Sequence, residues 1–157
     1  MEAGCIRRAG EGDLSRIAEI LVFAKRLNYR PIFHDDGYSF GELQVLNVVD
    51  GYRSDPARLA VTWVYDDGFV KGLIQIEGTE IRTLYVEPLF TGQGVGGQLV
   101  DFAISRFGVT TLWVLAKNER AQAFYGRHGF ACTGRRRLEE GTVEYLVEMH
   151  RTAARKG

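Results

Sequence analysis

Apolar residues along the first part of the chain predict a short strand followed by a helix. The strand is expected over Cys5–Arg8, and Asp13 suits the N-cap position of the helix. The apolar positions of this helix recur at steps of three and four: Leu14, Ile17, Ile20, Leu21 and Ala24. The pattern fades near Asn28, and Tyr29–Tyr38, which contains Pro31, is predicted to be a loop.

A second helix and a β-hairpin are predicted next. Ser39–Glu42 fits a capping box, in which the serine and glutamate side chains cap opposite backbone amides. The helix that it opens has leucine and valine at helical spacing and should end before Asp55, which precedes a proline. Leu59–Tyr65 and Phe69–Ile76 are predicted strands joined by an Asp-Gly turn.

The central stretch combines a strand, a glycine-rich loop and a helix. Glu80–Val86 is β-branched and aromatic, and Pro88 should end this strand because proline cannot donate to a ladder. From Val95 to Phe107 the apolar residues return to helical spacing. Four glycines stand where this helix begins: Gly92, Gly94, Gly96 and Gly97.

The glycines indicate a place where the backbone approaches a ligand or adopts positive φ. Each costs roughly 1 kcal/mol relative to alanine if it is helical. The free amides of a helix N-terminus bind anions, and phosphate is a common guest. No Gly-Lys-Ser/Thr follows, which excludes a Walker A loop, whereas a dinucleotide pattern is formally met by Gly92, Gly94 and Gly97. A tight turn without a ligand is the other interpretation.

The remaining pattern predicts a mixed α/β fold with one sheet covered by helices. Thr110–Ala116 reads as a buried strand, and Glu119–His128 as a helix. Phe130–Arg136 and Val143–His150 are the last predicted strands. Residues 1–150 are therefore expected to form a single domain, and residues 151–157 a polar tail.

Composition narrows the class of protein. The chain has 157 residues with 45% hydrophobic and 25% charged content, which is ordinary for one globular domain. Basic and acidic residues balance at 20 each, so no global field favours nucleic acid or a membrane surface. Cys5 and Cys132 have no metal-ligand spacing and no disulfide framework, and the chain has no long apolar run. We expect a cytoplasmic protein without metal.

Two blocks of sequence together resemble the GNAT family of N-acetyltransferases. The first is Leu84–Gly96, LYVEPLFTGQGVG, which is similar to the family's acyl-CoA motif. The second is Asn118–Phe130, with Asn118, Phe124-Tyr125 and Gly129-Phe130 at the family's positions. The family usually has Arg or Gln where this chain has Thr91.

This resemblance implies a GNAT-like acyl-CoA N-acyltransferase fold, a mixed sheet of about seven strands flanked by about four helices. It implies that strands Glu80–Val86 and Leu112–Ala116 part at their ends and that the pantetheine arm of acetyl-CoA enters the gap. The cofactor-binding residues that it implies are Leu84, Tyr85, Val86, Thr91, Gly92, Gln93, Gly94, Val95, Gly96, Gly97, Asn118 and Tyr125.

The chemistry implied by the resemblance is direct acetyl transfer to a primary amine. Tyr125 is expected to protonate the leaving thiolate, and the alternative is a core tyrosine. Glu80 is expected to be the general base, and the alternative is a surface carboxylate paired with Arg82. For Asn118 the alternative, a helix N-cap, is compatible with cofactor binding. Other candidate bases are Glu77, Glu87 and His34.

The acceptor is expected to be a small molecule or a peptide that carries an amine. The residues expected to bind the acceptor lie in the predicted loop: Tyr29, Phe33, His34, Asp35, Asp36 and Tyr38. The alternative is that this segment is an ordinary polar loop without a binding role. A CoA-binding module without turnover and a transferase for a longer acyl donor are the alternative functions. The resemblance is also compatible with a homodimer.

Overall fold

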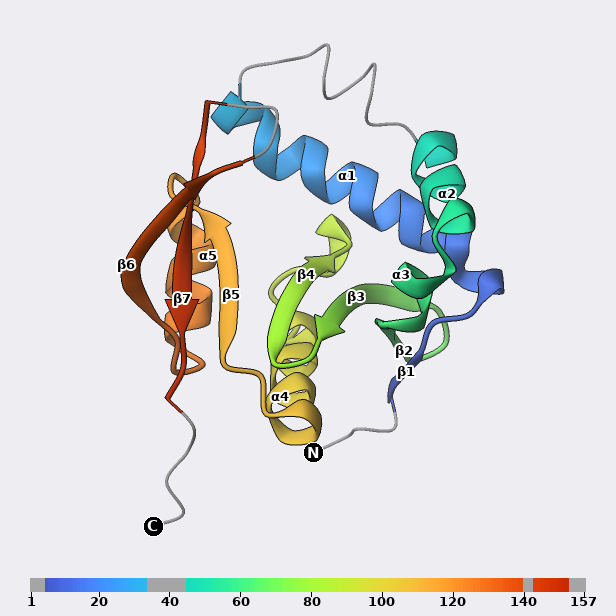
Figure 1. The fold of residues 1–157 in the computed structure, drawn as a ribbon. Helices are drawn as coiled ribbons and strands as arrows, with labels where there is room; N and C mark the ends of the chain where they lie inside the picture. The colour runs from blue at the N-terminus through green and yellow to red at the C-terminus, as the bar shows by residue number, and fades with distance from the viewer. Residues whose placement is uncertain (1–4, 34–44, 140–142, 153–157) are drawn as a thin grey trace. The chain divides into compact units, whose positions relative to one another are not determined.

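The computed structural model describes residues 5–33, 45–139 and 143–152, and the fold is a mixed α/β sheet with helices (Figure 1). Seven strands follow the order β1-β2-β3-β4-β5-β7-β6. The chain divides into two compact units, one of Met1–Gln75 with Thr83–Leu99 and one of Ile76–Arg82 with Val100–Gly157. The predicted fold class is confirmed.

The first unit begins with antiparallel strands. β1 (Ile6–Arg8) pairs with β2 (Thr62–Asp66), which pairs with β3 (Val70–Glu77). The expected start of β2 at Leu59 is wrong, because α3 (Pro56–Ala60) occupies that segment. Proline at the first position of a helix has its φ preset and loses no hydrogen bond there, which favours this short helix.

The first helix of the first unit extends further than predicted at its C-terminal end. α1 (Leu14–Phe33) continues through Tyr29–Phe33, so the prediction of a loop over those residues is wrong. Pro31 lies in the last turn, where the hydrogen bond that proline removes costs less than in a helix interior. Residues 34–42, with the rest of the loop and the capping box, lie outside the described residues. α2 (Val45–Ser54) ends before Asp55 as predicted.

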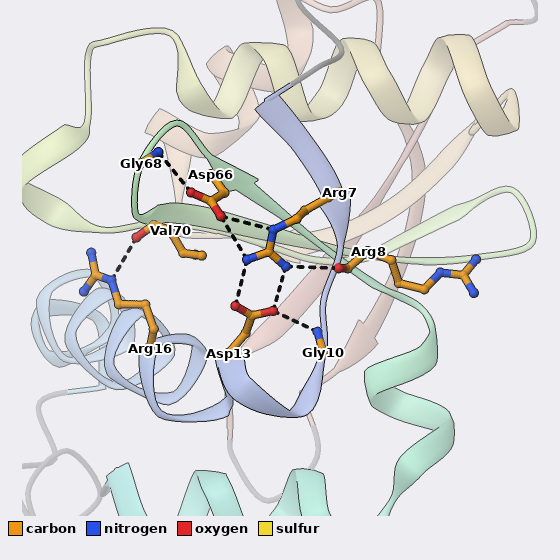
Figure 2. Close-up of polar contacts among 8 residues, drawn as sticks. All are labelled: Arg7, Arg8, Gly10, Asp13, Arg16, Asp66, Gly68 and Val70. Carbon is orange, nitrogen blue, oxygen red and sulfur yellow. Dashed lines mark hydrogen bonds and ion pairs between the residues drawn. The ribbon is translucent and has the colours of Figure 1, made fainter.

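An ionic cluster joins β1, the 3-10 helix η2 (Glu11–Asp13) that precedes α1, and the end of β2 with the turn after it (Figure 2). The guanidinium of Arg7 donates two hydrogen bonds of 2.9 Å to Asp13 and bonds of 2.9 and 3.1 Å to Asp66 Oδ2. The Gly10 amide donates to Asp13 and the Gly68 amide to Asp66. Hydrogen bonds from Arg7 lower the pKa of Asp13, whereas the Gly68 amide and then Arg7 lower the pKa of Asp66.

A buried polar cluster lies within the apolar core of the same unit. Gln75 Nε2 donates to the Tyr52 hydroxyl at 2.6 Å and to Thr62 Oγ1 at 3.2 Å, and Thr62 in turn donates to the Arg58 carbonyl. The three side chains are almost fully buried, so each hydrogen bond satisfies a group that water cannot reach. Burial raises the pKa of the Tyr52 hydroxyl.

The second unit contains the remaining strands. β5 (Thr111–Leu115) pairs antiparallel with β7 (Tyr145–His150), which pairs antiparallel with β6 (Ala131–Leu138). α5 (Glu119–Gly126) follows β5, and its Gln122 side chain donates to the carbonyls of Leu115 and Ala116. These elements confirm the predicted strands and helix.

Three elements belong partly to each unit: β3, whose last two residues lie in the second unit, β4 (Glu80–Val86) and α4 (Val95–Phe107). β4 and α4 have the predicted bounds. The first two residues of β4 pair in parallel with β5, Glu80 with Thr111 and Ile81 with Leu112. A short 3-10 helix, η4 (Pro88–Phe90), which was not predicted, follows β4. Within the described ranges, no helix has the length and apolar composition needed to cross a bilayer.

Candidate active site

The glycine loop precedes α4 and adopts backbone that favours glycine. Gly92 has φ +81° and Gly94 has φ +85°. A β-carbon at Gly92 would meet no atom within 4 Å, and one at Gly94 would meet only the side chain of Gln98 at 3.9 Å. Backbone conformation therefore explains these two glycines, and the space beside them is open to a ligand.

The first turn of α4 offers backbone donors. Gly94 O accepts from the Gln98 amide at 3.0 Å, so the amides of Val95, Gly96 and Gly97 precede the first intrahelical bond. Within the described residues, no protein acceptor binds these three amides. The first turn of this helix also carries no acidic side chain. Open amides and the positive end of the helix dipole suit a phosphate group.

Gly72 of β3, which sequence reasoning missed, brings α4 close to the sheet. A β-carbon at Gly72 would lie 3.0 Å from Val95 Cγ1, 3.1 Å from Tyr85 O and 3.2 Å from Leu99 Cδ1. Hydrogen in place of a side chain thus allows the first turn of α4 to pack against the strand. A lone glycine inside an otherwise apolar strand was the signal that could have identified it.

Residues before the loop are fixed by capping. Glu87 Oε2 accepts from the Leu89 amide at 2.7 Å, and Glu87 Oε1 lies 3.8 Å from Arg16 Nη1. The Thr91 hydroxyl donates to the Pro88 carbonyl at 3.0 Å. Glu87, a candidate base, therefore caps η4, and Thr91 holds the turn that leads into the glycines.

Asn118 and Tyr125 lie at the start and near the end of α5. Asn118 Oδ1 accepts from the Ala121 amide at 3.1 Å, which confirms the N-cap. No bond from Asn118 Nδ2 is present in the described part of the chain. Tyr125 is 9% exposed, with the rings of Phe124 and Phe130 at centroid distances of 5.2 and 6.0 Å. Both residues belong to the second unit, and their roles toward a cofactor stay predictions.

Glu80 is the first residue of β4. Its Oε2 lies 3.9 Å from Arg82 Nε, while Arg82 donates to Glu77 at 2.8 Å. The expected ion pair between Glu80 and Arg82 is thus present, but its distance is long. The role of Glu80 as general base stays a prediction. Across the described residues, no three His, Cys, Asp or Glu side chains gather as a metal site.

The remaining predicted site residues fall into two groups. Leu84, Tyr85 and Val86 are half-buried in the second half of β4, and Tyr85 packs against the core of the first unit. Tyr29 and Phe33 lie on α1 rather than in a loop. Four expected acceptor-binding residues lie outside the described residues: His34, Asp35, Asp36 and Tyr38.

Sequence comparison finds relatives across most of the chain. A model of the acetyltransferase (GNAT) domain matches residues 58–132, which include the glycine loop, Asn118 and Tyr125. Peptidyl-lysine N-acetyltransferase YjaB of Salmonella typhimurium is 32% identical over 135 residues, covering 86% of this chain and 88% of that protein.

Solved structures share the fold. The solution structure of apo-form YjaB from Escherichia coli matches with a TM-score of 0.70 at 26% identity, covering 95% of this chain and 97% of that one. yncA of Salmonella typhimurium, solved with its cofactor acetyl-CoA, matches with a TM-score of 0.65 at 19% identity, covering 95% and 93%.

Proposed function

The chain belongs to the GNAT family of N-acetyltransferases, and on this premise we propose that it transfers the acetyl group of acetyl-CoA directly to the amine of a lysine side chain in a peptide or protein. The lysine acceptor is supported by the relative from Salmonella typhimurium, which is named as a peptidyl-lysine N-acetyltransferase. A small-molecule amine is the second candidate acceptor.

The observation that carries the proposal is the glycine loop at the start of α4. Its positive-φ glycines, the open space beside them and the unbonded amides of the first turn fit a diphosphate. The contributing residues are Gly92, Gln93, Gly94, Val95, Gly96 and Gly97. Leu84, Tyr85 and Val86 would contact the pantetheine arm through their main chain. We include in this proposal the expected gap between β4 and β5, through which the pantetheine arm would enter.

Bound acetyl-CoA supplies the acetyl group as a thioester. The nitrogen–carbon bond of the amide forms, the carbon–sulfur bond breaks, and one proton must move from the amine to the thiolate. Glu80 would accept the amine proton, and Tyr125 would hold the proton that the thiolate takes, because a tyrosine hydroxyl is protonated at neutral pH. Asn118 Nδ2 would donate to the cofactor while Oδ1 caps α5.

Two alternative functions can be distinguished by experiment. The first is a CoA-binding module without turnover, which is suggested by Thr91 at a position where the family usually has Arg or Gln. The second is a transferase that uses a longer acyl donor. Membership of the family favours a thioester cofactor over a dinucleotide. We also propose a cytoplasmic location, which two free cysteines support, and we propose that neither nucleic acid nor a membrane is a partner.

The test is acetyl transfer to a lysine peptide. The protein is incubated with acetyl-CoA and a peptide containing one lysine, and free thiol and peptide mass are followed. The control peptide has arginine in place of lysine, and a panel of small amines runs in parallel. We expect thiol release matched by acetylation of the lysine peptide alone. Acetyl transfer only to small amines would contradict a peptide acceptor. Binding of acetyl-CoA without thiol release would favour a CoA-binding module without turnover.

A further inference from the structure

The C-terminal end of β5 is bonded to a side chain of α5. β5 pairs in parallel with β4 at Thr111 and Leu112, and in the structure as described this pairing goes no further along β5. Gln122 Nε2 donates to the carbonyls of Leu115 at 3.1 Å and of Ala116 at 2.9 Å. α5 thus lies beside β5 (Figure 1) and is attached where that strand ends.

The Gln122 side chain is fully used in this attachment. A glutamine amide has two donor protons, and each goes to one of the two carbonyls. Its Oε1 lies 3.8 Å from the thiol of Cys132 on β6. Two bonds from one planar amide to consecutive carbonyls fix both the position and the rotation of the helix at this residue. The side chain therefore acts as an anchor, with no donor left for a ligand.

α5 has few other contacts that could fix its orientation. The helix has eight residues, all of them described, and only Tyr125 among them is buried. A helix this short is not stable by itself in water, so its orientation depends on contacts with the sheet. Tyr125 supplies an apolar contact in the last turn, and Gln122 supplies a polar contact three residues earlier.

Gln122 lies between the two residues of α5 that have roles in the proposed function. The Asn118 amide donates to the Leu115 carbonyl at 2.9 Å, so this carbonyl accepts from both Asn118 and Gln122. The Gln122 amide in turn donates to the Asn118 carbonyl at 3.2 Å. Tyr125 follows Gln122 by three residues, which places the two on one side of the helix. A shift at Gln122 would therefore move Asn118 and Tyr125 together.

We propose that Gln122 is a positioning residue for acetyl transfer: by anchoring α5 to the end of β5, it sets the places of the Tyr125 hydroxyl and the Asn118 side-chain amide. The inference rests on the proposed function, in which Tyr125 protonates the thiolate and Asn118 binds the cofactor. Displacement of a reacting group by about 1 Å can lower a rate by up to about 100-fold. Loss of the anchor should therefore lower kcat.

A purely structural role is the other interpretation of the same hydrogen bonds. Under that interpretation, loss of the bonds would weaken the fold and lower activity to the same extent with or without the Tyr125 hydroxyl. Under our proposal, the effect on kcat depends on the hydroxyl that Gln122 positions. A double-mutant cycle between Gln122 and Tyr125 separates the two interpretations.

The test is thiol release from acetyl-CoA with a lysine peptide, measured well below the melting temperature of each variant. Gln122→Met keeps a long side chain that suits a helix but removes both donors. We expect kcat to fall about tenfold in the native background and less than about twofold in the Tyr125→Phe background. Ala123→Met puts the same side chain at the neighbouring exposed position and should keep the native kcat.

Two further variants show whether the hydrogen bonds matter rather than the shape of the side chain. Gln122→Lys has an ammonium group that can donate to the same carbonyls, so it should recover most of the kcat that Gln122→Met loses. Gln122→Asn keeps an amide but is one methylene too short to reach both carbonyls. It should behave like Gln122→Met in both backgrounds and repeats the cycle with a second side chain.

The outcomes distinguish this inference from the proposed function. An unchanged kcat in Gln122→Met, an equal fall in the two backgrounds, or no recovery in Gln122→Lys would overturn the inference and leave the proposed function standing. Absence of thiol release from the native chain would contradict the proposed function, and the inference would fail with it.

Discussion

Gly72 and Val95 approach so closely that a β-carbon on Gly72 would lie 3.0 Å from Val95 Cγ1. Gly72 lies on β3, and Val95 is the first residue of α4, directly after the glycine loop. Contacts this short force neighbouring groups to shift. The position of the helix start, and hence of its amides, therefore depends on a strand residue that has no side chain.

Gly72→Ala should destabilise the fold by about 1–3 kcal/mol and weaken acetyl-CoA binding, because α4 must move away from β3. Val95→Ala removes the shortest side-chain contact. The loss of unfolding free energy in the double variant should be smaller than the sum of the two single losses by about 1 kcal/mol. Urea unfolding and titration calorimetry check this, and strict additivity would contradict the contact.

Tyr125→Phe should lower kcat about 100-fold with little change in the KM for acetyl-CoA, since it removes a proton donor and keeps the ring. The measurement is steady-state thiol release with a lysine peptide. A melting temperature close to that of the native chain serves as the control for folding. An unchanged kcat would leave Tyr125 as a core tyrosine only.

The two roles of Asn118 can be separated by two substitutions. Asn118→Ala removes the cap of α5 and should cost about 1 kcal/mol of stability. Asn118→Asp keeps a capping oxygen but loses the Nδ2 donor, so stability should be retained while acetyl-CoA binding weakens. Native affinity in the aspartate variant would show that Asn118 acts as a cap alone.

The Arg7 cluster predicts a fall of stability in acid. The pKa values of Asp13 and Asp66 are lowered in the folded state, so their contribution is complete above the ordinary value of 3.8 and declines as the pH falls below it. Arg7→Gln should cost about 1–2 kcal/mol at neutral pH, allowing for the half-exposed guanidinium.

Urea unfolding at neutral pH and at about pH 3 measures this effect. The Arg7→Gln chain should lose less stability between the two conditions than the native chain does. Arg53→Gln, at the exposed end of α2, is the control and should lose as much as the native chain. A steeper loss in the Arg7 variant would contradict the assignment of the lowered pKa values to this cluster.

Patterns that depend on local chemistry were predictable from the sequence. β4 and α4 have the predicted bounds, because proline ends the one and apolar periodicity defines the other. The extension of α1 through Pro31 was not predictable from a rule that treats proline as a helix end. α3 was not predicted because a helix of five residues is too short to show the helical spacing of apolar residues.

The candidate site was predictable where the backbone itself demands a residue type. Positive φ at Gly92 and Gly94 agrees with the glycine pattern, and Asn118 caps α5 as its place before the helix suggested. Gly72 was missed because the residues that require it, Val95 and Leu99, lie far along the chain. Glu87 was predicted only as a candidate base, and its capping of η4 was missed because a carboxylate can serve in either role.

The central claim is that the open amides of the glycine loop bind the diphosphate of the cofactor. Titration calorimetry of CoA and of pantetheine, which lacks the diphosphate, into the native chain and the Gly94→Ala chain tests it most directly. We expect CoA to bind far more tightly than pantetheine, and Gly94→Ala to remove most of that difference, because alanine disfavours φ near +85°. Equal binding of CoA and pantetheine, or an undiminished difference in the variant, would contradict the account.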